Sequence, residues 1–87
     1  MVIFSDAEFE ILKKYKNIRI IEEKDRNLVE RLQQQGMLNC SFDIKDGKGY
    51  EAARMKHPFQ RRQLAREIIS RNPFYKAVYD TVTTLYH

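Results

Sequence analysis

The stretch RLQQQGMLNCSFDIKDGKGYEAARM, residues 31–55, decides the fold because it joins a helical pattern to two extended ones. Gly36 follows the helical pattern at the place where a left-handed residue commonly ends a helix. Apolar and polar residues then alternate from Leu38 to Lys45, which predicts a strand with one wet face. The sequence DGKG at 46–49 supplies the positive φ angles that a tight reversal needs. Because two strands alone are unstable in water, this β-hairpin is expected to lie on helices.

A capping box predicts a helix near the start of the chain. Ser5 and Glu8 have the required spacing, and Phe4 and Phe9 hold the positions of a hydrophobic staple. The helix is expected to run from about residue 6 to residue 16. The segment that follows, NIRIIEEK at 17–24, allows two interpretations, because its isoleucines fit both a short strand and a continued helix.

A second helix is predicted from about Arg26 to Gln35, immediately before the hairpin. Asp25 is expected to be its N-cap. Leu28, Val29 and Leu32 form its apolar stripe and are expected to be buried.

Two more helices are predicted after the hairpin. Pro58 suits the first position of one, and Asn72-Pro73 repeats this start signal for a last helix over 73–86. The helix from Pro58 is expected to bury Phe59, Leu64, Ala65, Ile68 and Ile69, with Arg61, Arg62, Arg66 and Arg71 pointing elsewhere. The wide apolar arc of the last helix fits either the core or a second copy of the chain, and a chain of this length favours a homodimer. The dimer interface is then expected to comprise Phe74, Tyr75, Val78, Tyr79, Val82, Leu85 and Tyr86.

The positive charge is concentrated in one part of the chain. The formal net charge is +4, and residues 52–72 hold six basic side chains against one acidic one, Glu67. A local excess of cations favours phosphate backbones and other anions. A solvated arginine-rich helix face would give the same pattern, so both interpretations stay open.

Length and composition fit a single domain, 1–87, of a cytoplasmic protein. The one cysteine, Cys40, cannot form an intramolecular disulfide, which suits a reducing compartment. No apolar run approaches the roughly 18 residues that a membrane span needs, so no membrane partner is expected. His57, His87 and Cys40 offer too few ligands for a metal site and no convincing nucleophilic pair. We therefore expect no enzyme activity, metal or cofactor.

The pattern around the hairpin resembles the second half of a winged helix-turn-helix domain. Leu28, Leu32, Gly36, Met37 and Leu38 stand where that family closes its recognition helix and enters the wing. The resemblance covers residues 25–55. It implies an α+β, mostly helical, winged-helix-like fold with a two-stranded hairpin, and residues 58–87 would form a C-terminal extension of two helices.

The resemblance also implies a function. The chain would be a small dimeric DNA-binding protein that regulates transcription by occupying a site on double-stranded DNA. The helix 26–35 would enter the major groove, where Arg, Asn and Gln side chains can contact base edges. The hairpin tip and the residues that follow it would contact the DNA backbone. The expected DNA-binding residues are Arg26, Asn27, Arg31, Gln34, Lys45, Lys48, Arg54, Lys56, Arg61 and Arg62. The alternative is a protein-interaction module, such as a small inhibitor or adaptor of mobile-element or viral type, that grips an acidic partner without DNA.

Overall fold

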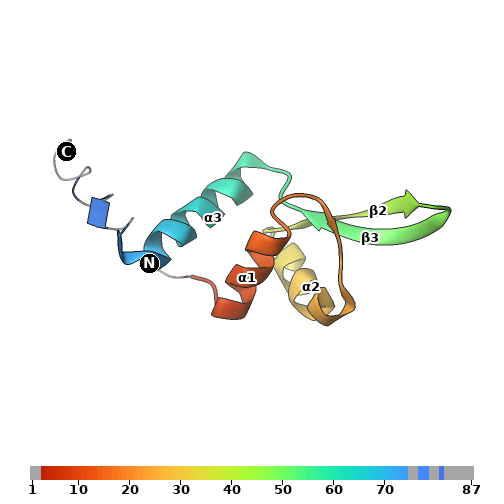
Figure 1. Cartoon of the computed structure of the whole chain (residues 1–87), viewed down its shortest axis with the longest axis horizontal. Coiled ribbons are helices and arrows are strands. Elements are labelled where there is room, and N and C mark those ends of the chain that lie inside the picture. Colours follow the sequence, from red (N-terminus) through yellow and green to blue (C-terminus); the bar gives the residue numbers. More distant parts are fainter. Residues whose placement is uncertain (1–2, 75–76, 79–80, 82–87) are drawn as a thin grey trace.

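The described part of the chain folds into three helices, whose bounds are given below, and a three-stranded antiparallel sheet, as shown by a computed structural model (Figure 1). The structure describes residues 3–74, 77–78 and 81. Their elements are, in order, α1 (Asp6–Lys14), β1 (Arg19–Ile20), the 3-10 turn η1 (Glu23–Asp25), α2 (Arg26–Gln34), β2 (Asn39–Lys45), β3 (Lys48–Arg54) and α3 (Pro58–Arg71). The α+β class is therefore confirmed. No helix in these ranges is both long and apolar enough to cross a membrane.

The sheet has a third strand beside the predicted hairpin, which confirms the short-strand interpretation of residues 17–24. The strand order is β1-β3-β2, with Arg19 opposite Ala53 and Ile20 opposite Ala52. The amide of Ile21 extends this pairing by donating to the carbonyl of Glu51 at 2.8 Å. Residues 17–24 thus form a short strand and the first residues of a 3-10 turn, and the continued helix is wrong.

Local sequence signals place the element ends correctly in three cases. Both capping-box bonds are present, from the Glu8 amide to the Ser5 hydroxyl and from the Ser5 amide to the Glu8 carboxylate. Gly36 has a φ of 77° where α2 ends. Asp46 and Gly47 have φ values of 54° and 77°, which is the two-residue turn that matches the twist of a hairpin. The helices α1 and α2 end two residues and one residue earlier than expected, within ordinary fraying.

The hairpin lies on the helices only at its base, so the prediction that it lies on helices is confirmed for that part alone. Leu38 is buried and Cys40 half-buried, but Phe42 and Ile44, on the same face, are each 71% exposed. In Figure 1 the far half of β2 and β3 extends beyond α2 into open space. The strands are simply longer than the helical layer beneath them.

The predicted buried face of α3 is confirmed at Leu64 and wrong at most other positions. Phe59 is 61% exposed, Ala65 and Ile68 lie at the surface, and Ile69 is half-buried. Gln60 and Glu67 are buried beside Leu64 instead. The Glu67 carboxylate accepts from the amides of Ile3 and Phe4, at 3.0 and 2.9 Å. These polar side chains are buried because they satisfy backbone groups that would otherwise be left without partners.

Arg71 also departs from the expectation, because it is directed inward, toward the start of the chain. Its guanidinium donates to the Asp6 carboxylate at 2.6 Å and to the carbonyl of Phe4, and lies 4.3 Å from the centre of the Phe9 ring. Arg71 and Glu67 together hold residues 3–6 against the last two turns of α3.

Candidate nucleic-acid interface

The helix α2 presents one polar stripe to solvent. Val29 and Leu32 are buried against the rest of the fold, so the opposite side faces outward. Asn27, Arg31 and Gln34 are exposed there, with Glu30 in the same stripe. Three of the four side chains expected to contact bases are therefore accessible.

The fourth, Arg26, is committed within the protein. Its guanidinium bonds to Glu23 at 3.1 Å and to Glu51 at 3.0 Å, which ties the start of α2 to β3. These hydrogen bonds raise the pKa of Arg26 above its already high ordinary value. A guanine contact would have to compete with both carboxylates.

Cations gather where the end of β3 meets the start of α3. The carbonyl of Lys16 accepts from the amide of Met55 and from the guanidinium of Arg61, both at 3.3 Å. This brings the loop after α1 beside Arg54, Lys56 and the first turn of α3. We call the exposed side chains of this region the junction cluster, which comprises Lys16, Arg54, Lys56, Arg61 and Arg62.

A buried glutamine joins the junction cluster to the end of α2. The Gln60 carbonyl oxygen accepts from the amides of Lys56 and His57, at 2.8 and 3.0 Å. Its amide nitrogen donates to the carbonyl of Gly36 at 3.0 Å and to the Asn39 side chain at 2.8 Å. The C-terminal end of the α2 stripe therefore adjoins the junction cluster.

The hairpin tip lies apart from this region and is not cationic overall. Lys45 and Lys48 are opposite each other across the ladder, next to the turn. Lys45 is six steps along the strand from Asn39, so the tip is about 20 Å from the junction cluster at roughly 3.3 Å per residue. Asp43 and Asp46 balance the two lysines. The structure thus does not unite the ten expected DNA-binding residues on one compact patch.

Within the described part of the chain, the cations and acids differ in how far they are paired. Nine basic side chains carry no ion pair there: Lys16, Arg31, Lys45, Lys48, Arg54, Lys56, Arg61, Arg62 and Arg66. Six acids are in ion pairs, namely Asp6, Glu10, Glu22, Glu23, Asp25 and Glu51, and five described acids are not, namely Glu8, Glu30, Asp43, Asp46 and Glu67. The positive potential of the surface therefore comes from the unpaired cations.

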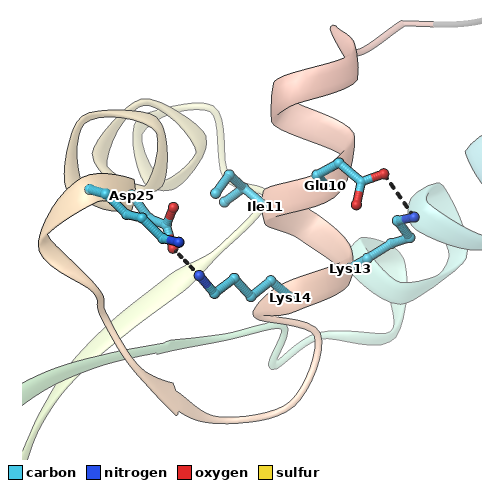
Figure 2. A pocket seen from close by; sticks show the side chains of 6 residues that line it. Glu10, Ile11, Lys13, Lys14 and Asp25 are labelled. Atoms are coloured by element: carbon cyan, nitrogen blue, oxygen red, sulfur yellow. Dashed lines mark hydrogen bonds and ion pairs between the residues drawn. The ribbon is translucent and has the colours of Figure 1, made fainter.

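A charged cluster between α1 and η1 corrects the expected role of Asp25. Its side chain does not cap α2. Instead the buried carboxylate accepts from Lys14 at 2.6 Å and from the Tyr15 hydroxyl at 2.8 Å, and that hydroxyl accepts from the Glu22 amide. Figure 2 shows Lys14 reaching from α1 to Asp25 at the edge of a shallow hollow.

The protonation states in this cluster follow from its geometry. Burial alone would raise the pKa of Asp25, but the bonds from Lys14 and Tyr15 outweigh it and lower that pKa. The same bond to Asp25, with one to Glu22, raises the pKa of Lys14. The charged groups at the hollow thus satisfy each other, and their role is to hold the 3-10 turn on α1.

The expected dimer interface falls mainly on residues that the structure does not describe. Phe74 and Val78 are 70% and 47% exposed. Tyr75, Tyr79, Val82, Leu85 and Tyr86 lie outside the described residues. Of the last helix predicted over 73–86, residues 73–74, 77–78 and 81 are helical and the others lie outside the described residues.

The described residues contain no group of three or more His, Cys, Asp or Glu side chains that could hold a metal ion. Burial raises the pKa of the Cys40 thiol, which disfavours the reactive thiolate.

In comparisons with known proteins, no family model matches the chain, and neither a curated protein nor a solved structure shows significant similarity to it.

Proposed function

We propose that the chain binds double-stranded DNA, with the exposed stripe of α2 in the major groove and the junction cluster on adjacent phosphates. Asn27, Arg31 and Gln34 supply donors and acceptors that suit base edges. The observation that carries the proposal is the pairing pattern, because within the described residues the junction cluster forms no ion pair, whereas six acidic side chains do.

The proposal is supported by an order of elements that resembles a winged helix but lacks one part. A helix, a strand, a helix and a hairpin follow one another, and the first strand pairs with the last. The 3-10 turn Glu23–Asp25 stands where a helix-turn-helix would have its middle helix. In this proposal, the Lys14–Asp25 bond takes over the role of positioning α2.

The test is the salt dependence of binding to a mixed-sequence duplex. Each phosphate contact contributes about 0.9 to the slope of log K against log salt, so Lys56→Ala is expected to lower that slope by about one. Arg31→Ala is expected to weaken binding to a preferred sequence more than to random duplex. Lys24→Ala is the matched control, since this exposed lysine neighbours Glu22 and lies outside the proposed surface. Absence of any binding at low salt would refute the proposal.

A specific observation favours a second candidate, a protein interaction through α3. Phe59, Arg62 and Arg66 are exposed at helical spacing on one side of this helix. An aromatic side chain beside two arginines suits an acidic segment that also carries apolar residues. Arg66→Glu would abolish such an interaction and leave duplex binding nearly intact, which separates the two functions.

A further inference from the structure

We infer that β2 is a self-pairing edge, through which two copies of the chain join their sheets into one. The strand has β3 on one side, and no strand in the described ranges pairs with its other side. Residues 41–45 are all exposed. A free edge of this length is a template for another strand.

The backbone of β2 has donors available on this free edge. The turn at residues 46–47 makes Lys45–Lys48 a hydrogen-bonded pair, so alternate amides along β2 face β3. The amides of Cys40, Phe42 and Ile44 consequently face outward. The Ile44 amide is consistent with this orientation, because it donates to the side chain of Asp43 at 2.9 Å.

The apolar side chains at the far end of the hairpin need a cover that the described chain does not supply. Phe42 and Ile44 are on the face that buries Leu38 nearer the helices, and each is 71% exposed. The Phe42 ring lies over Gly49, where a β-carbon would come within 2.1 Å of it. This leaves the other side of the ring open to a partner.

The sequence of β2 favours a second copy as that partner. A twofold axis through Phe42 pairs all seven residues of Asn39–Lys45 with the same strand of the second copy. Phe42 then faces Phe42, Cys40 faces Ile44, Ser41 faces Asp43 and Asn39 faces Lys45. No like charges are opposed, and the Asp43 and Asp46 charges balance the two lysines of the tip. An axis through Asp43 would instead oppose two carboxylates.

The resulting six-stranded sheet has a defined arrangement. Because the axis is perpendicular to the sheet, both copies of α2 lie on the same face. Pairing requires the Ile44 amide to exchange the Asp43 carboxylate for the carbonyl of Cys40 in the second copy. The inference does not depend on DNA binding, since it concerns the protein alone.

The first test is the mass of the protein in solution, measured by light scattering. The 87-residue chain of 10.5 kDa is expected at twice that mass. Phe42→Glu places two carboxylates opposite each other at the axis and is expected to give monomers with an unchanged circular dichroism spectrum. Val78→Glu, in the last segment, is the control and is expected to remain dimeric. A monomeric parent chain, a dimeric Phe42→Glu variant, or loss of the dimer in Val78→Glu alone would overturn the inference.

The second test examines the register. Ile44→Cys puts a thiol opposite Cys40 of the second copy, whereas within one chain these positions are about 13 Å apart along the strand and cannot be bridged. Mild oxidation is expected to give a reducible covalent dimer. Ile18→Cys, at an exposed position on the β1 side of the sheet, is expected to give little covalent dimer under the same oxidation. Equal cross-linking of the two variants would show random collision and overturn the register.

Discussion

Replacing Gln60 tests whether its four hydrogen bonds hold the junction together. Gln60→Leu keeps a similar volume and removes both polar atoms from a site that is 3% exposed. Each net hydrogen bond is worth about 0.5–1.5 kcal/mol, which gives about 2–6 kcal/mol for four. The amides of Lys56 and His57 belong to exposed residues and can recover water, so we expect about 2–4 kcal/mol. A protein of this length has about 4–13 kcal/mol of stability in total, so the loss is large.

Urea denaturation followed by circular dichroism measures this loss. With a slope of about 1.5 kcal/mol per M, the midpoint is expected to fall by about 1.3–2.7 M without a change of slope. Gln33→Leu is the matched control, because Gln33 is exposed and its side chain forms no hydrogen bond with the described residues. It is expected to change stability by less than about 0.5 kcal/mol. If Gln60→Leu behaved like this control, the bonds seen at Gln60 would not hold α3 to the end of α2.

Three further predictions concern other parts of the fold. Glu67→Leu removes the acceptor for two backbone amides and is expected to destabilise by about 1–3 kcal/mol, with faster hydrogen exchange at Ile3; unchanged exchange there would contradict this. The fold lowers the pKa of Asp25 below 3.8, so its carboxylate stabilises the fold above that pH, and this stabilisation is lost as pH falls through the folded-state pKa. The difference in unfolding free energy between the parent chain and Asp25→Asn should therefore shrink below about pH 4. A difference that stays constant with pH would contradict this. Gly47→Ala, at a φ of 77°, is expected to cost about 1–2 kcal/mol in thermal or urea unfolding, and a stabilised variant would contradict the turn geometry.

Local chemistry made much of the fold predictable. The capping box at Ser5, the left-handed Gly36, the Asp46–Gly47 turn and the Pro58 start each depend on residues close in sequence. The same holds for the exposed stripe of α2, whose spacing is set by one helix. These features agree with the structure because no distant partner decides them.

Features that depend on distant partners were missed. Apolar identity predicted that Phe59 and Ile68 would be buried, but the buried face of α3 is chosen by backbone groups elsewhere, which Gln60 and Glu67 satisfy. One signal existed, since Gln60 is the third residue of the helix that begins at Pro58, a position from which a side chain can reach back to the helix start. Asp25 gave no such signal, because its partner Lys14 is on another helix.

The grip of α3 on residues 3–6 makes the chain a good subject for circular permutation. Glu67 and Arg71 bring the first described residues beside the end of α3 (Figure 1), so a short linker can join these two places. New ends opened between Asp46 and Gly47 would lie at an exposed turn far from the core. Such a rearranged chain would keep the described contacts between the helices while breaking the covalent link between β2 and β3, and so would show whether the two strands need their turn to stay paired.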